Sequence, residues 1–315
     1  MTMPYALPQA FLDRMQMMLS DADYNHFIQQ FSGNNRLYFV LNPFKNNPDQ
    51  TISTLEKLCI DLKPHPEIPL FGELTWSIDH QHKSMLTYHE MHNLGYFYLL
   101  GLPSILTVAA LNPKPNDTIL DLTAAPGGKT FLMAILMHNT GQIVANDQSK
   151  SRFFKLIANL ERLNITNVNC RLSDGRKINK TFMAQFDKVL LDAPCSCESR
   201  FNVHIKKTLK YWGVNKIKAC VGMQKQLILN AFRACKPGGQ LVYSTCTFSP
   251  EENEGIMCYL KKKHPSALLQ DIELPYGRHG VATWEKYNYP QGQKTLRILP
   301  NKSHTGGCIS KVSVL

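Results

Sequence analysis

Two cysteines and one aspartate stand where two buried strands are predicted to end. Asp192 and Cys195 follow the apolar run at 186–191, and Cys246 follows the apolar run at 240–245. A lone cysteine in such a position is most often a core residue, because free cysteine is among the most buried residue types. A carboxylate beside it is unfavourable in a core, because burying an unpaired charge is costly. The set therefore predicts a reactive site in which a thiolate acts as the nucleophile.

The loop at 121–130 (DLTAAPGGKT) ends in Gly-Lys-Thr, the residues that close a phosphate-binding P-loop. A P-loop also needs a glycine at the position that Thr123 occupies here, because the backbone must turn around the phosphates. Pro126 removes a further amide donor from the loop. We therefore expect a ligand without phosphates, and the missing glycine argues against an ATPase.

Two further aspartates end the next predicted strands along the chain. Asp147 comes 20 residues after Gly127, where an acidic side chain accepts hydrogen bonds from ribose hydroxyls in dinucleotide-binding folds. Asp174 ends the following strand, where it can meet an adenine amino group. Gly127 and Gly128 allow the backbone to pass close to a ligand. These residues predict S-adenosylmethionine, which has a ribose, an adenine and a sulfonium but no polyanion.

Methylation of cytosine at carbon 5 needs the residue types found in these motifs. Carbon 5 is not nucleophilic until another group has added to carbon 6. A thiolate can add there, and a protonated carboxyl group can hydrogen-bond ring nitrogen 3. Carbon 5 then takes the methyl group from a sulfonium, a base removes the carbon-5 proton, and the thiolate leaves. The motifs therefore favour this reaction as a hypothesis.

Strand and helix patterns alternate from residue 113 onward. The apolar runs predict strands at 117–123, 141–148, 167–175, 186–194 and 240–248, and helical spacing predicts helices at 129–138, 150–164 and 216–236. A last helix is expected to begin after Ser249 as its cap. This alternation predicts an α/β fold with a mainly parallel sheet and helices on both faces. Ligands bind beyond the carboxyl ends of the strands in such sheets, which gathers the motifs in one place.

The formal net charge of +11 is unevenly distributed. Residues 1–112 hold 6 Lys and Arg against 10 Asp and Glu, so that 29 against 14 remain for residues 113–315. The segment between Glu198 and Glu251 holds nine basic and no acidic side chains, together with Phe201, Tyr211 and Trp212. A solvated surface is the simpler explanation for such a run, but its confinement to one segment with aromatic residues favours nucleic acid as the partner.

The sequence resembles the Nop/Sun, or RsmB/RsmF-type, RNA cytosine-5 methyltransferases. The matching motifs are DLTAAPGGKT (121–130, cofactor loop), AND (145–147, ribose-binding acid), SDGRK (173–177), FDKVLLDAPCS (186–196) and KPGGQLVYSTCTFSPEENE (236–254). The likeness covers roughly residues 94–300. It implies a Rossmann-like, S-adenosylmethionine-dependent methyltransferase fold acting on ribosomal or transfer RNA.

The resemblance also implies a role for each site residue. Cys246 would be the covalent nucleophile, and Cys195 would assist release of the methylated product. Asp192 would contact the cytosine and lie near the cofactor, and Lys129 would reach the base or act in proton transfer. The residues implied to hold S-adenosylmethionine are Thr123, Ala124, Ala125, Pro126, Gly127, Gly128, Lys129, Asp147, Asp174 and Asp192.

Several positions depart from the family pattern. Leu100 and Gly101 stand where the family usually has a glutamine and an acidic residue, and Val40 replaces an arginine of an N-terminal element. Thr123 replaces a cysteine, and Cys197 replaces a glycine. The changes at Leu100, Gly101 and Val40 concern the positioning of the substrate. None of the changes affects the predicted nucleophile, Cys246.

The chain is expected to consist of two domains. Residues 1–92 mix short helical and strand patterns and predict a smaller α+β domain that positions RNA. Residues 93–315 are the predicted catalytic domain, and RNA is expected to contact its basic segment 199–225. The apolar stretch 96–111 is too short for a membrane span and is interrupted by Gly101 and Pro103. We therefore expect no membrane contact.

Nine scattered cysteines and the lack of a secretory signal favour reduced thiols and a cytoplasmic location. Only Cys195 and Cys197 are spaced as a metal-binding pair, and no second pair completes a zinc site, so no metal is predicted. A different class of function stays open: a catalytically inactive RNA-binding or ribosome-assembly protein with the same fold. The intact set of Asp192, Cys195 and Cys246 favours the enzyme.

Overall fold

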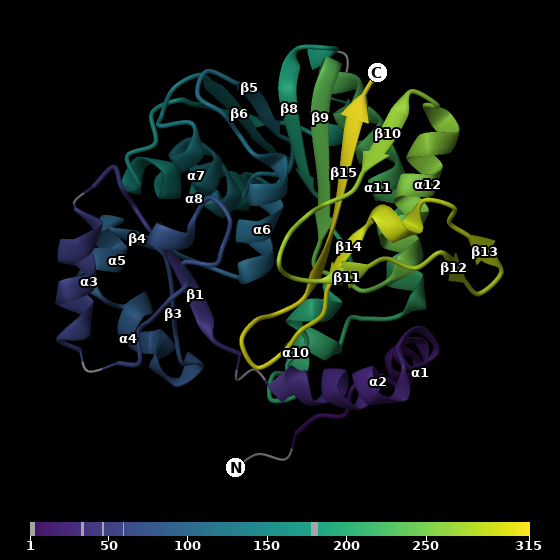
Figure 1. The fold of residues 1–315 in the computed structure, drawn as a ribbon, viewed down its shortest axis with the longest axis horizontal. Helices are drawn as coiled ribbons and strands as arrows, with labels where there is room; N and C mark the ends of the chain where they lie inside the picture. The colour runs from purple at the N-terminus through teal and green to yellow at the C-terminus, as the bar shows by residue number, and fades with distance from the viewer. Residues whose placement is uncertain (1–3, 33–34, 46, 59, 178–181) are drawn as a thin grey trace.

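A large sheet covered by helices forms the centre of the molecule (Figure 1). The computed structural model describes residues 4–32, 35–45, 47–58, 60–177 and 182–315. Five strands of this sheet are parallel, in the order β7-β6-β5-β8-β9. Their bounds are β5 (Thr118–Asp121), β6 (Gln142–Asp147), β7 (Val168–Leu172), β8 (Phe186–Asp192) and β9 (Cys235–Thr245). The prediction of a mainly parallel, Rossmann-like sheet is confirmed.

Antiparallel strands extend the sheet beyond β9. The C-terminal strand β15 (Gly307–Val314) lies between β9 and β14 (Leu296–Ile298), and runs antiparallel to both. The short strand β11 (Arg278–His279) pairs with β14, and β10 (Ala267–Gln270) pairs with the far end of β15. A separate hairpin joins β12 (Thr283–Trp284) to β13 (Tyr287–Asn288).

Helices cover both faces of the sheet because alternate strand residues point to opposite sides. Ile119 of β5 packs in the core with α6 (Leu102–Leu111) and α7 (Gly128–Leu136). Leu120, its neighbour, packs in the other core with α11 (Val214–Ala234) and α12 (Glu254–Lys263). The helix α8 (Lys150–Arg162) packs beside β6 and β7 through Leu156 and Leu160. The central strands β5, β6 and β8 therefore have cover on both sides, whereas the edge strand β7 has no fully buried residue.

Two predicted boundaries differ from the structure. The last helix does not begin after Ser249: a 3₁₀ turn (Pro250–Glu252) comes first, and α12 begins at Glu254. The side chain of Ser249 donates to Glu251 Oε2 at 2.7 Å instead of capping the helix. In addition, β9 begins at Cys235 and runs through the Pro-Gly-Gly turn signal, because this stretch pairs with the start of β8 across a register shift.

The N-terminal part contains a second, antiparallel sheet in the order β2-β3-β1-β4. Its strands are β1 (Leu37–Leu41), β2 (Lys63–Pro64), β3 (Thr75–Ile78) and β4 (Phe97–Leu100). The helices of this part are α3 (Pro48–Glu56), α4 (Lys83–Thr87) and α5 (Glu90–Leu94), with 3₁₀ turns at Gly72–Leu74 and His80–His82. This sheet continues to Leu100, and the division of the chain at residue 92 stays a prediction.

The first two helices lie away from that sheet, beneath the catalytic part (Figure 1). They are α1 (Gln9–Met18) and α2 (Asp21–Ile28), followed by a 3₁₀ turn (Gln29–Ser32). Phe11 and Phe27 pack edge-on against Phe201 and Phe248, with ring centroids 5.0 Å apart in each pair. Phe201 precedes the short helix α10 (Lys206–Leu209). The N-terminal helices and the start of the basic segment therefore share one apolar cluster, although they are distant in the sequence.

Within the described part of the chain, no helix combines the length and apolar character that crossing a bilayer requires. The apolar stretch 96–111 forms β4 and α6, and every residue of α6 from Ile105 to Leu111 is buried.

Candidate active site

The loop after β5 is held in place by contacts with neighbouring strands. Thr123 Oγ1 donates to the backbone oxygen of Asp192 at 2.8 Å, and Ala124 N donates to the backbone oxygen of Asn146 at 2.7 Å. The side chain of Asn159 on α8 donates to the backbone oxygen of Pro126 at 2.8 Å. The loop is therefore preorganised by β6, β8 and α8.

The structure requires glycine at positions 127 and 128 of the loop for two different reasons. Gly127 has φ +105°, in the region that favours glycine, and starts α7 from there. A Cβ at Gly128 would lie 2.8 Å from the ring of Tyr98 on β4. A side chain at position 128 would therefore clash with an aromatic ring of the N-terminal sheet. The sequence analysis did not predict this contact.

Asp147 and Asp174 line one small hollow beyond β6 and β7. The buried carboxylate of Asp147 accepts hydrogen bonds from Ala125 N at 3.2 Å and Ser149 N at 2.9 Å. Asp174 accepts hydrogen bonds from the guanidinium of Arg176, which lowers the pKa of that carboxyl below its ordinary value. The predicted pair of carboxylates therefore lies together, with arginine side chains beside it.

Asp192 lies between a lysine and a serine at the end of β8. Lys129 Nζ donates to Asp192 Oδ2 at 2.7 Å, and Ser244 Oγ donates to Asp192 Oδ1 at 2.9 Å. Lys129 stands at the start of α7 and Ser244 near the end of β9. Both carboxylate oxygens are thus oriented by side chains from two other elements.

The two predicted catalytic cysteines are in contact. Cys195 follows β8 and Cys246 follows β9, and their Sγ atoms lie 3.2 Å apart. A third thiol, that of Cys197, donates to the backbone oxygen of Cys195 at 3.3 Å. All three Sγ atoms lie within 4.8 Å of one another. Neighbouring parallel strands bring residues from distant parts of the chain to the same edge.

Each of the three thiols affects the protonation of the others, because their sulfur atoms lie close together. Hydrogen bonds from Cys195 and Cys246 lower the pKa of Cys197, and the positive charge of Arg200 contributes. Hydrogen bonding with Cys197 and Cys246, together with burial, raises the pKa of Cys195. The positive charge of Arg200 also favours a thiolate at Cys246, although the net pKa of Cys246 lies above the ordinary value because Cys197 and burial raise it.

A cavity of about 640 Å³ joins the loop, the aspartate and the cysteines. Its lining includes Thr123, Ala124, Ala125, Pro126, Gly128, Lys129, Asp192, Cys195 and Cys246. Thr123, Arg152 and Pro194 line both this cavity and the small hollow with Asp147 and Asp174. A ligand with a nucleoside at one end can therefore place its other end beside the cysteines.

These residues fit S-adenosylmethionine. The chemistry of the donor set suits its adenosine, because Asp147 is a buried carboxylate at the end of β6, where dinucleotide-binding folds hold a ribose, and Asp174 lies in the same hollow. That hollow measures only about 20 Å³, because the side chains of Arg152 and Arg176 stand at its rim. Both side chains are exposed, at 51% and 42%, and can turn outward to admit the adenosine.

Two buried glutamates support the cysteine loops, and the sequence analysis did not identify them. Glu252 accepts hydrogen bonds from Ser196 Oγ at 2.5 Å and from Gln224 Nε2 at 2.9 Å. Glu198 accepts from Phe248 N at 2.8 Å. Burial raises the pKa of Glu252 to about 7. Glu252 stands in a matching motif and Glu198 lies two residues beyond another, but their orientation depends on contacts across about fifty residues.

Asp121 is a further buried carboxylate in the cavity that the sequence analysis missed. It ends β5, and its Oδ2 accepts a hydrogen bond from Thr130 Oγ1 at 2.7 Å. Burial raises its pKa to about 7, although the hydroxyl of Thr130 and the charge of Lys129 lower it in part. The rule that strand ends carry ligand-binding residues could have identified this aspartate.

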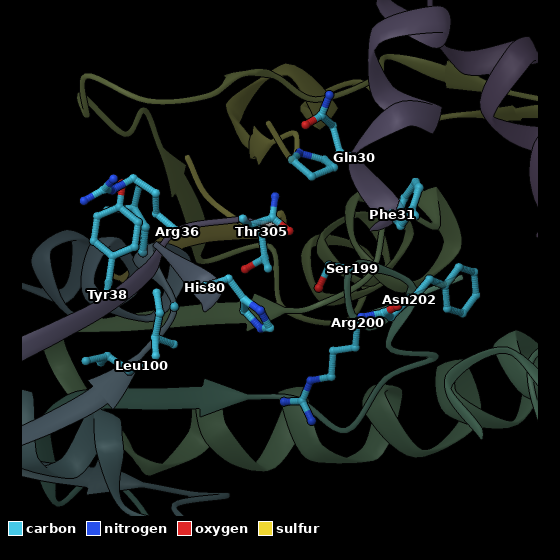
Figure 2. A pocket seen from close by; sticks show the side chains of 16 residues that line it. Gln30, Phe31, Arg36, Tyr38, His80, Leu100, Ser199, Arg200, Asn202 and Thr305 are labelled. Carbon is cyan, nitrogen blue, oxygen red and sulfur yellow. The ribbon is translucent and has the colours of Figure 1, made fainter. Parts of the chain in front are cut away.

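A second hollow of about 290 Å³ adjoins the cysteine cavity, and both are lined by Leu100, Gly101 and Arg200. Figure 2 shows His80, Ser199 and Thr305 around this hollow, on three separate segments of the chain. The departures at Leu100 and Gly101 therefore lie at the junction of the two spaces. Val40, the other departure, is fully buried in β1.

The three aromatic residues of the basic segment differ in how far they are exposed to solvent. Phe201 is buried, and Trp212 packs edge-on against it and donates to Glu198 Oε1 at 3.0 Å. Only Tyr211 of the three is exposed, at 66%. Phe201 and Trp212 belong to the apolar cluster beneath the sheet, so of the three aromatic residues only Tyr211 is available to contact a nucleic acid. Lys206, Lys207, Lys210 and Lys218 are exposed.

The sheet order, the loop after β5 and the carboxylates at the strand ends define a Rossmann-like, S-adenosylmethionine-dependent methyltransferase. The chain belongs to the 16S rRNA methyltransferase RsmB/F family, whose model matches residues 108–311.

Three comparisons illustrate the relationship. The chain is 36% identical over 270 residues to a tRNA (cytosine(49)-C(5))-methyltransferase of Pyrococcus abyssi, covering 84% of this chain and 83% of that protein. It is 38% identical over 219 residues to the 25S rRNA (cytosine-C(5))-methyltransferase nop2 of Schizosaccharomyces pombe, covering 68% of this chain but only 36% of that longer protein. The crystal structure of a methyltransferase homologue from Pyrococcus horikoshii superimposes with a TM-score of 0.82 at 27% identity, covering 98% of this chain and 95% of that one.

Proposed function

We propose that this protein transfers a methyl group to carbon 5 of a cytosine in RNA through a covalent cysteine intermediate. The observation that carries the proposal is the contact between Cys195 and Cys246 beside Asp192, in a cavity that reaches the nucleoside hollow. The relatives named for cytosine-C5 methylation of tRNA and rRNA support this reaction.

Cys246 is the nucleophile in this proposal. Its thiolate adds to carbon 6 of the cytosine, and the electron pair displaced from the ring makes carbon 5 nucleophilic. S-adenosylmethionine supplies an electrophilic methyl group when it is bound. Once carbon 5 carries the methyl group, its proton must leave to a base, and the bond between Sγ and carbon 6 then breaks. Cys195, in contact with Cys246, assists this last step.

Asp192 and Lys129 orient the base and move protons. The carboxyl group of Asp192 hydrogen-bonds ring nitrogen 3, because it lies at the end of β8 next to the cysteine loop. Lys129, at 2.7 Å from Asp192, holds that carboxyl group and is within reach of a proton on it. Removing such a positioned acid–base group typically lowers a rate by about 10²–10⁴-fold.

RNA approaches from the side of α10 and the N-terminal sheet. The hollow of Figure 2 continues from the cysteine cavity toward His80 and Asn202, and its size suits a nucleotide next to the target. Residues 1–92 and the basic segment 199–225 hold the strand in this proposal. The reaction needs reduced thiols, in keeping with the predicted cytoplasmic location.

The test follows single cysteine variants incubated with labelled S-adenosylmethionine and unmethylated RNA. Cys246→Ala is expected to abolish labelling and to form no adduct. Cys195→Ala is expected to accumulate a covalent protein–RNA adduct, seen as a shifted band in denaturing gels. Cys235→Ala is a control, because this buried cysteine stands at the start of β9, away from the cavity.

Two results would contradict the assignment. An adduct with Cys246→Ala instead of Cys195→Ala would reverse the two roles. An unmodified RNA, under conditions in which the protein binds both cofactor and RNA, would favour the inactive RNA-binding protein.

A further inference from the structure

Three thiols line the cavity of about 640 Å³, one more than the proposed reaction uses. Cys195 and Cys246 are in contact at 3.2 Å, and Cys197 brings its Sγ within 4.8 Å of both. Cys197 has a left-handed backbone (φ +62°), which is uncommon for a residue with a side chain. This turn directs the chain back toward the other two thiols, so that a third sulfur joins them.

The spacing of the three sulfurs suits a soft cation. Zinc binds thiolates at about 2.3 Å in a tetrahedron, which places the sulfurs roughly 3.8 Å apart. The observed contacts, from 3.2 Å to at most 4.8 Å, bracket this value and require only small side-chain movements. Three sulfur ligands select Zn²⁺, Cd²⁺ or Cu⁺ over Mg²⁺ or Ca²⁺, which prefer oxygen.

The loops that carry the thiols are held together before any cation arrives. Ser196, between the two cysteines of the β8 loop, bonds through Oγ to Thr247 Oγ1 at 2.6 Å, next to Cys246. Its backbone N donates to the buried carboxylate of Glu252 at 3.0 Å. Because these contacts join the β8 loop to the β9 loop, little conformational freedom is lost when a cation binds.

The three thiols are accessible from the cavity, and a positive side chain lies beside them. All three cysteines and Arg200 line the cavity of about 640 Å³. A divalent cation with three thiolates has a net charge of −1, and the guanidinium of Arg200 offsets this charge. A cation held by three thiolates keeps a fourth tetrahedral position that a water molecule can fill.

We propose that Cys195, Cys197 and Cys246 bind one thiophilic divalent cation such as Zn²⁺, and that this cation reversibly blocks the active site. Binding releases the thiol protons to solvent and occupies the sulfur of Cys246, which then cannot add to a pyrimidine. The blocking effect rests on the proposed methyl transfer, whereas cation binding does not. The third ligand explains why the spacing of Cys195 and Cys197 alone predicted no metal: the partner comes from the neighbouring strand.

The binding test uses the reduced full-length chain under anaerobic conditions. Titration with Co²⁺ is expected to give sulfur-to-metal charge-transfer absorption at one equivalent per chain, and Zn²⁺ is expected to displace it. Cys197→Ser should lower the affinity for Zn²⁺ by at least about 100-fold, because a ligand is lost. Cys258→Ser is the matched control, since this half-buried cysteine lies on α12, outside the cluster.

A second experiment measures the rate of methyl transfer with and without Zn²⁺. Each protein is compared with its own rate without Zn²⁺. Wild type and Cys258→Ser should be inhibited and recover with a chelator, whereas Cys197→Ser should keep most of its own metal-free rate at the same Zn²⁺ concentration. Equal Zn²⁺ affinity of wild type and Cys197→Ser would overturn the proposal, as would thiol counts showing a Cys195–Cys246 disulfide in place of metal binding under reducing conditions. Metal binding by a protein without methyl transfer would refute the proposed function and leave the cation site standing.

Discussion

Lys129 Nζ lies 2.7 Å from Asp192 Oδ2, and this contact links the start of α7 to the end of β8. The side chain of Lys129 is 15% exposed and that of Asp192 34%. The pair therefore lies at the boundary between the protein interior and the cavity, where a lysine can orient a carboxyl group and still exchange protons with a bound base.

Lys129→Met should slow methyl transfer more than it weakens cofactor binding. The substitution keeps the length of the side chain but removes the charge that orients Asp192, so kcat is expected to fall on the order of 100-fold or more. Single-turnover rates with saturating RNA, together with calorimetry of S-adenosylmethionine, measure the two effects separately. Lys150→Met on α8 is a charge-matched control. A normal rate for Lys129→Met would remove this lysine from the mechanism.

Asp147→Ala should weaken cofactor binding. The buried carboxylate is placed to accept hydrogen bonds from ribose hydroxyls, and hydrogen bonds to charged groups are worth about 1.5–3 kcal/mol each, so the affinity is expected to fall at least tenfold. Calorimetry with S-adenosylhomocysteine gives the dissociation constant. Glu161→Ala, on the exposed side of α8, should bind normally. Unchanged affinity in Asp147→Ala would argue against the ribose role.

Asp121 should make the folded protein less stable as the pH rises from about 4 to about 7. Burial raises its pKa from 3.8 to about 7, so the native state binds more protons than the unfolded chain across this range. The stabilisation from the protonated form is complete at low pH and is lost as the pH rises through about 7, at about 1.4 kcal/mol for each unit of pKa shift.

The variant Asp121→Asn isolates this contribution. The amide oxygen can still accept the hydrogen bond from Thr130, but the group no longer titrates. Urea unfolding at several pH values should show a shallower decline of stability with pH than in wild type. Parallel curves for the two proteins would show that the carboxyl group does not have a raised pKa.

Lys206→Glu with Lys207→Glu should weaken RNA binding and reduce its dependence on salt. Both lysines are exposed on α10, which lies below the central sheet in the view of Figure 1. Each lost phosphate contact lowers the slope of log K against log salt by about 0.7 for single strands. Lys262→Glu with Lys263→Glu on α12 makes the same change in charge elsewhere (Figure 1). An equal loss in both double variants would show that only net charge matters.

The order of elements and most of the site could be predicted from the sequence. Apolar runs report which strands are covered on both faces, and the rule for carboxyl ends of parallel strands then places Asp147, Asp174, Asp192, Cys195 and Cys246 at one edge. These inferences depend only on local pattern and on the direction of the chain, both of which are properties of the sequence alone.

Other features were decided by contacts between distant segments. Phe201 and Trp212 resemble surface aromatics in a basic run, but the N-terminal helices cover them.

The chain by itself determined which chemical groups are present and which strands carry them. Only the tertiary structure decided that Cys197 turns toward Cys246, that Glu252 holds the cysteine loops, and that Asp121 is buried deeply enough to shift its pKa. The physical reason is that burial and hydrogen bonding depend on distances across the folded sheet, and no local pattern in the sequence contains those distances.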